Sequence, residues 1–139
     1  MYEHLYALVD ELGLRDRVRF LGYVSPDDLP LWYNAADLFA YPSAYEGFGL
    51  PLLEAMACGV ACITSSSSSL QEVAADACLM VEPGSEEELA MAITHALTDE
   101  PFRSELEVKG QRRAEDFSWF ETARQTAGVY EHTVAVRRQ

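Results

Sequence analysis

The sequence predicts an α/β fold in which helices cover a parallel sheet of about four strands. Two observations predict this class. Short apolar runs rich in β-branched and aromatic residues alternate with longer helical patterns, and the helical patterns begin at clear capping signals. No repeat or linker divides the chain, so residues 1–139 are expected to form one domain, with 118–139 as its C-terminal helix.

The order of the elements gives the expected topology. Because strands and helices alternate, consecutive strands would lie parallel and connect through helices. The strands are expected at 18–22 (VRFLG), 37–42 (DLFAYP), 60–64 (VACIT) and 77–81 (ACLMV). The helices are expected at 2–13, 26–36, 50–58, 70–75, 86–98, 101–115 and 119–135.

Serine residues mark several of the helix starts. S-x-x-E capping boxes begin at Ser69, Ser85 and Ser118. The serine run that ends at Ser69 is therefore expected to be a strand-to-helix turn rather than a flexible linker. Trp119 and Phe120 begin the last helix and are expected to dock it onto the core.

The charge distribution restricts the class of ligand. The net charge is −13, and the span between Arg19 and Arg103 holds 13 acidic residues and no Lys or Arg. This balance disfavours nucleic acid and anionic membranes as partners. An anionic ligand in this span would depend on backbone N–H groups, helix dipoles or cations from elsewhere.

Other features of the composition favour a cytoplasmic location, in solution or at the cytoplasmic face of a membrane. No apolar run reaches the roughly 18 to 20 residues of a transmembrane helix, and the acidic N-terminus is unlike a signal peptide. Cys58, Cys62 and Cys78 form no CxxC pair, so they are expected to be small buried apolar residues, and no metal site is expected.

The stretch EGFGLPLLEAMACG carries the most specific signal. In open parallel sheets, ligands bind beyond the carboxyl ends of the strands, where this loop is expected. Gly47 and Gly49 permit close backbone approach, and the following apolar helix should be buried. Glu54 is then either a carboxylate bonded to local backbone or an Arg, or an acceptor for ligand hydroxyls such as a ribose diol. Glu46 is either a solvated loop acid or a second group in the same crevice.

Two helix starts would face the same crevice. The N-termini at Gly49–Leu50 and Ser69–Leu70 would present free N–H groups to a diphosphate, with serine hydroxyls as further donors. The chain contains neither a G-x-G-x-x-G fingerprint after a strand nor a P-loop motif.

The order of these motifs resembles a known family. FLG (20–22), AD-x-F-x-YPS (36–43), EGFGLPLLE (46–54) and SSSLQEV (67–73) follow one another as in retaining glycosyltransferase family 4, also called the group 1 glycosyltransferases. The similarity runs from about residue 2 to the end and corresponds to the C-terminal donor-binding domain of the GT-B fold. It implies a Rossmann-like three-layer domain.

The resemblance also implies residue roles. Members of hexosyltransferase type transfer a sugar from a UDP-, GDP- or ADP-linked donor with retained configuration, without a further cofactor and usually without a metal. Glu46 would be the catalytic contact near the reacting carbon, and Glu54 would bind the ribose hydroxyls. The other implied donor contacts are the Gly22–Tyr23 turn at the base, Gly47, Phe48, Gly49 and Leu50 at the hexose and phosphates, and Ser68, Ser69 and Leu70 at the diphosphate.

The sequence departs from the family in what it lacks. Ala61 and Gln71 replace common prolines, which are framework positions. The N-terminal acceptor domain and the first two strands of the donor domain, with their Gly-Arg turn and Lys, have no counterpart. The chain is therefore expected to be inactive alone and to need an N-terminal half or a second copy as partner. The alternative is a non-catalytic module acting in assembly or binding. Without the two central strands, either the sheet rearranges or a partner fills the gap.

Overall fold

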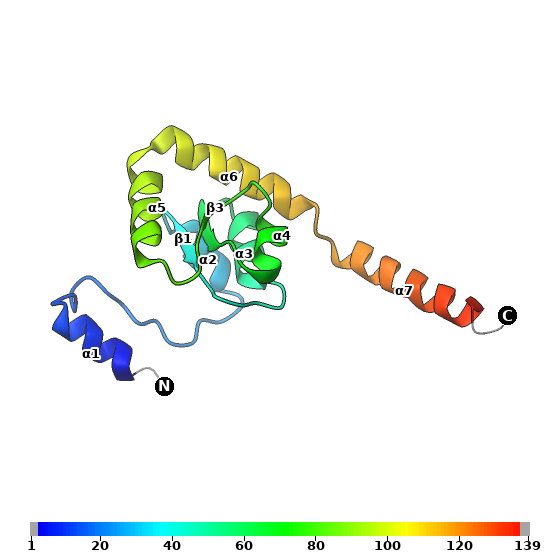
Figure 1. The fold of residues 1–139 in the computed structure, drawn as a ribbon, viewed down its shortest axis with the longest axis horizontal. Coiled ribbons are helices and arrows are strands. Elements are labelled where there is room, and N and C mark those ends of the chain that lie inside the picture. Colours follow the sequence, from blue (N-terminus) through cyan, green and yellow to red (C-terminus); the bar gives the residue numbers. More distant parts are fainter. Residues whose placement is uncertain (1–2, 137–139) are drawn as a thin grey trace.

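A computed structural model describes residues 3–136 (Figure 1). The start of the expected helix 2–13 and the end of the expected C-terminal segment 118–139 lie outside this range. The helices are α1 (Glu3–Glu11), α2 (Leu29–Asn34), α3 (Leu50–Ala57), α4 (Ser68–Ala74), α5 (Glu86–Thr98), α6 (Glu100–Glu115) and α7 (Trp119–Val136). The strands are β1 (Phe39–Tyr41), β2 (Cys62–Ser65) and β3 (Leu79–Val81).

The three strands form one parallel sheet in the order β1-β2-β3. Phe39 pairs with Cys62 and Tyr41 with Thr64, so the carboxyl ends of β1 and β2 lie side by side. The α/β class and the parallel sheet are confirmed. Within residues 3–136 three of the four expected strands form, and the one expected at 18–22 does not.

The missing strand is the segment 18–22. A strand needs a neighbour for its backbone groups, and within residues 3–136 the outer edge of β1 stays open. Instead, Phe20 packs on Tyr6 of α1, with ring centroids 4.2 Å apart. Figure 1 shows α1 and the chain that follows it beside the core, and α1 has no buried residue. The rearranged sheet expected as one alternative therefore does not form in this range.

Two apolar layers enclose the sheet. On one side Leu52, Met56 and Leu70 pack against Cys62, which joins α3 and α4 to β2. On the other side Ile63 belongs to a smaller cluster with α5. Neighbouring residues of β2 thus point to opposite layers, as the pleat requires. This arrangement confirms the three-layer architecture.

Helix α6 packs directly on α3. Gly110 of α6 lies against Met56 of α3, where an added Cβ would meet the Met56 side chain at 3.4 Å.

Cys62 and Cys78 are buried free thiols, as expected, whereas Cys58 is half-buried. None of the helices described between residues 3 and 136 has the length and apolarity to cross a membrane.

The last helix leaves the core. The hydroxyl oxygen of Ser118 accepts from the N–H of Glu121 at 3.4 Å, as that of Ser85 does from Glu88, so the serine half of each expected capping box forms. The reciprocal half does not form, because the Glu88 carboxylate accepts from the N–H of Glu82 and that of Glu121 from Arg124 and Gln125. However, α7 projects away from the sheet (Figure 1) and buries none of its residues. Trp119 and Phe120 are 79% and 78% exposed. The expectation that they dock α7 onto the core is wrong, because neither side chain is buried and α7 extends away from the sheet.

Candidate functional site

The loop after β1 is bonded to the turn after β2. The carbonyl oxygen of Ser43 accepts from the hydroxyls of Ser65 and of Ser67, the latter at 3.0 Å. Thr64 donates its hydroxyl to the carbonyl oxygen of Tyr41 at 3.0 Å. Thr64 and Ser65 are fully buried, so these bonds are shielded from water. The serine run is therefore a structured strand-to-helix turn, as expected.

The peptide groups of Glu46 are held by the next two serines. The N–H of Glu46 donates to the Ser68 hydroxyl oxygen at 3.0 Å, and the Ser69 hydroxyl donates to the Glu46 carbonyl at 2.9 Å. The expected capping box at Ser69 is wrong, because α4 starts two residues earlier than expected, with Ser67 in the N-cap position. The Ser69 hydroxyl thus donates to the loop, whereas the Ser68 hydroxyl accepts from it and its own O–H is available as a donor.

The carboxylate of Glu46 has a tyrosine partner. The hydroxyl of Tyr41 donates to Glu46 Oε1 at 2.6 Å. This bond, with a smaller contribution from the Ser43 hydroxyl, holds the pKa of Glu46 below its ordinary value. The same bond is the main cause that raises the pKa of Tyr41 to about 12. Glu46 is therefore an ionised acceptor fixed at the carboxyl end of β1.

Glu54 has a similar but longer contact. The hydroxyl of the buried Tyr33 lies 3.3 Å from Glu54 Oε2. Burial, then the nearby Glu54 charge, raises the pKa of Tyr33 to about 12. The helix α3 is buried at Leu52, Ala55 and Met56 but leaves Glu54 exposed. The expectation that the helix is buried is therefore wrong on one face, where Leu50, Glu54 and Ala57 are exposed. No Arg pairs with Glu54 among the ion pairs of residues 3–136.

The glycine-rich part of the loop approaches α4 closely. Gly49 is buried, has φ +100°, and contacts Leu70, which is fully buried. The N–H of Leu70 already donates to the Ser67 carbonyl at 3.1 Å. Gly47 lies in open space with an ordinary φ. Only Gly49 of this pair therefore requires a glycine for the backbone path.

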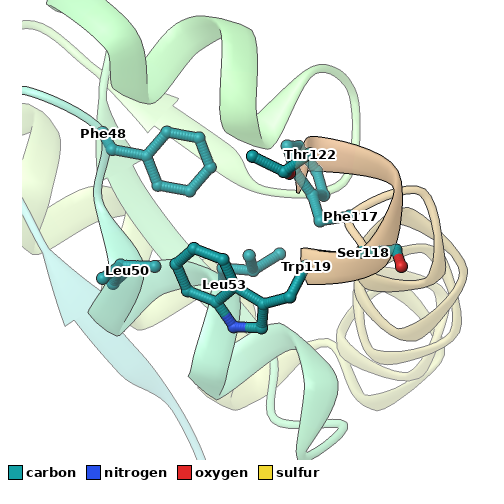
Figure 2. Close-up of a pocket in the computed structure, with 7 residues that line it drawn as sticks. All are labelled: Phe48, Leu50, Leu53, Phe117, Ser118, Trp119 and Thr122. Atoms are coloured by element: carbon teal, nitrogen blue, oxygen red, sulfur yellow. The ribbon is translucent and has the colours of Figure 1, made fainter. Parts of the chain in front are cut away.

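Phe48 and Leu50 line a small apolar pocket beside the loop. Figure 2 shows their side chains facing Leu53, Phe117 and Trp119 across it. The pocket encloses about 90 Å³, and Phe48 meets Phe117 edge to face at 5.8 Å. Trp119 thus contributes to this pocket although it is largely exposed.

The two residues expected at the base make no bond to the rest of the candidate site. Gly22 (φ +68°) and Tyr23 (87% exposed) lie between α1 and α2. None of the hydrogen bonds that the structure shows within residues 3–136 joins either of them to 46–54 or 68–70. The bonds and contacts of the structure therefore bring together Glu46, Gly49, Ser68, Ser69 and Leu70, and do not include the 22–23 turn.

Sequence reasoning missed the partners of the carboxylates. Tyr41 falls within the expected strand 37–42 and Tyr33 within the expected helix 26–36, and neither position by itself indicates a bond to a carboxylate. The alternation of β1 and the position of Tyr41 at its carboxyl end were available as signals. The path of the loop from Pro42 to Tyr45, which returns Glu46 to the Tyr41 hydroxyl, has no such signal.

The raised tyrosine pKa values predict a loss of stability in alkali. Tyr33 and Tyr41 titrate near 12 when folded and near 10 when unfolded. Their contribution to the free energy of unfolding is complete below pH 10 and is lost as the pH rises towards 12. We expect urea midpoints to fall over this window. The variant carrying both Tyr33→Phe and Tyr41→Phe should show a shallower fall, and an equal slope would contradict the assignment.

Comparisons with known proteins identify the family. The sequence profile described as "Glycosyl transferases group 1" matches residues 1–113. The chain belongs to this family of glycosyltransferases, and its α/β structure matches the C-terminal domains of GT-B members.

Relatives and solved structures agree with this assignment. O-antigen chain mannosyltransferase B of Escherichia coli is 42% identical over 126 residues, which cover 91% of this chain and 33% of that protein. The structure of sucrose-phosphate synthase from Thermosynechococcus elongatus matches with a TM-score of 0.87 and 35% identity, over 96% of this chain and 34% of that one. Anabaena Alr3699/HepE in complex with UDP and glucose matches with a TM-score of 0.86 and 28% identity, over 94% and 36%. The chain thus spans about a third of the length of each.

Proposed function

We propose that this chain is the donor-binding portion of a nucleotide-sugar-dependent glycosyltransferase that retains configuration at the transferred carbon. The observation that carries the proposal is the fixed position of Glu46. Its peptide groups are bonded to Ser68 and Ser69, and its carboxylate is bonded to Tyr41. An acceptor that is already oriented spends little conformational entropy on binding, which suits recognition of sugar hydroxyls.

Within this proposal the residues take the roles that the family resemblance implies. Glu46 accepts hydrogen bonds from the donor sugar near the reacting carbon, and the exposed Glu54 accepts from the ribose. The main chain of 47–50 contacts the hexose, and the turn at 22–23 the base. The Ser69 hydroxyl already donates to the Glu46 carbonyl, so its residue contributes to the diphosphate through its backbone N–H, whereas the Ser68 hydroxyl only accepts and its O–H is also available as a donor. The resemblance implies that the transfer needs no metal, and the proposal keeps this expectation.

The diphosphate needs positive charge from outside the motif region. Leaving-group stabilisation depends on donors or cations placed at the developing charge. In residues 20–102 the chain has no Lys or Arg. Arg113 of α6 donates to the carbonyls of Glu72 and Val73 in α4. We propose that an N-terminal half, or a second copy of the chain, supplies these cations and that the 139 residues alone do not catalyse transfer. Light scattering on the purified chain tests whether a second copy supplies the cations. A purely monomeric mass would exclude this source.

Calorimetry tests the donor site directly. UDP, GDP and ADP are titrated into the chain, and then UDP-glucose, GDP-mannose and ADP-glucose. We expect one nucleotide to bind with Kd of about 1 mM or below, and its sugar conjugate to bind more tightly. Glu54→Gln should weaken binding of the free nucleotide. Glu46→Gln should remove most of the gain from the sugar.

A matched control and a clear failure complete this test. Glu72 lies exposed on α4, and its carboxylate takes part in none of the side-chain hydrogen bonds or ion pairs that the structure shows within residues 3–136, although its carbonyl accepts from Arg113. Glu72→Gln removes one charge close to the same loop and should leave the affinities within about twofold. Absence of binding for all six ligands at several millimolar would reject the donor site. It would favour the alternative, a non-catalytic module, which the shortage of cations already supports.

A further inference from the structure

The side chain of Tyr41 is fixed by the sheet rather than by the loop. Tyr41 is the last residue of β1 and pairs in register with Thr64. Its carbonyl accepts from the Thr64 hydroxyl at 3.0 Å, and its ring stacks near Phe39, with centroids 6.0 Å apart and planes 14° apart. Main chain and ring are therefore both held, so the hydroxyl has a defined position at the edge of the sheet.

Glu46 has one remaining freedom that Tyr41 removes. Ser68 and Ser69 fix the peptide groups on either side of its Cα, but the side chain is only half-buried and would otherwise sample several rotamers. The 2.6 Å bond from Tyr41 selects one of them. A carboxylate has about four lone-pair sites, so the bond leaves acceptor capacity for a ligand.

We propose that Tyr41 is a positioning residue that holds the Glu46 carboxylate, still charged, towards the hydroxyls of the donor sugar. This inference rests on the proposed function, and Tyr41 itself does not contact the ligand. A phenol suits the task because it donates a hydrogen bond without adding charge. An Arg or Lys at this position would neutralise the carboxylate and compete for its oxygens. The contact of Tyr33 with Glu54 repeats the arrangement at the second carboxylate.

Nuclear magnetic resonance tests the bond without any ligand. The carboxyl carbon of Glu46 is followed from pH 2 to 7 in the wild type and in Tyr41→Phe, which keeps the ring and its packing. We expect the pKa of Glu46 to rise towards its ordinary value in this variant, because the main cause of its depression is lost. Tyr33→Phe and Tyr6→Phe are the controls, since Tyr6 packs on Phe20 far from the loop. An unchanged pKa of Glu46 in Tyr41→Phe would overturn the proposal.

Binding then tests whether the bond serves the sugar. The affinities of UDP-glucose and of GDP-mannose are each divided by that of the free nucleotide. We expect Tyr41→Phe to lower this ratio about 3- to 10-fold, the loss of one hydrogen bond that orients a charged group. In a Glu46→Gln background the same change should have almost no further effect. Equal losses for nucleotide and nucleotide sugar, or full additivity with Glu46→Gln, would overturn the positioning role.

The two experiments separate this inference from the proposed function. If the wild type binds none of these nucleotides, the proposed function fails, while the titration of Glu46 still decides whether Tyr41 holds it. If the wild type binds and the ratio is insensitive to Tyr41→Phe, the donor site stands and the role of Tyr41 fails.

Discussion

Gly49→Ala is expected to lower the free energy of unfolding by about 2–4 kcal/mol. Gly49 has φ +100°, which an L side chain rarely adopts, and a Cβ built there would lie 2.6 Å from Leu70 Cδ2. Leu70 is fully buried in the core, so a shift of its methyl group away from the new Cβ would disturb the residues packed around it. Both the backbone and the packing therefore oppose the substitution. Urea unfolding followed by circular dichroism measures the loss.

Two further variants separate the causes. Gly47→Ala changes the same loop at a residue that has an ordinary φ and open space, so it should cost less than about 1 kcal/mol. Leu70→Ala removes the clashing methyl group. In that background Gly49→Ala should cost clearly less than in the wild type, and the remainder measures the backbone strain. A loss of stability as small as that of Gly47→Ala would contradict the geometry assigned to Gly49.

Arg113→Ala is expected to lower the free energy of unfolding by about 2 kcal/mol. The last carbonyls of a helix have no partner within it, and α4 ends in the chain turn at Ala75, where φ is +48°. Arg113 donates to the carbonyls of Glu72 and Val73 at 2.8 and 3.0 Å, and its guanidinium lies over the ring of Phe117. Removing it leaves both carbonyls without these donors and separates α4 from α6. The midpoint of thermal or urea unfolding reports the change.

The neighbouring Arg112 provides the matched control. It is exposed on the same helix and takes part in none of the hydrogen bonds or ion pairs formed by residues 3–136. Arg112→Ala should therefore change stability by less than about 0.5 kcal/mol. Arg113→Lys should recover part of the loss at most, because an ammonium cannot place two fixed donors on two carbonyls. Equal effects of Arg112→Ala and Arg113→Ala would reject this bonding pattern.

Elements with strong local signals were predicted from the sequence. The strands near 60–64 and 77–81 and the helix at 86–98 combine apolar runs with turns or caps that act within a few residues. The segment 18–22 has the same apolar composition but forms no strand, because a strand depends on a neighbour that composition cannot supply. The exposed position of α7 could not be predicted for a similar reason, because docking of a helix depends on contacts with distant parts of the chain.

The candidate site was predictable in its acids but not in their partners. The spacing of Glu46 and Glu54 in a glycine-rich, apolar stretch marked both. Glu46 is fixed by bonds to Ser68 and Ser69, which follow it by 22 and 23 positions in the chain. The bonds of Arg113 to α4 span 40 and 41 positions. Such contacts depend on the path of two loops at once. The directions of the Ser68 and Ser69 hydroxyls could therefore not be read from their position in a helix start.

The hydroxyl bonds between the two loops can form during folding only after the two loops have come together. They join the segment after β1 to the segment after β2, and a complete helix, α3, lies between them in the chain. Parallel strands cannot pair through a tight hairpin, so the ends must diffuse together before any of these bonds can form. The orientation of Glu46 is thus acquired late, when the β1–β2 pairing closes. A nascent chain that has already formed α3 would carry both glutamates eight residues apart, without yet having a site.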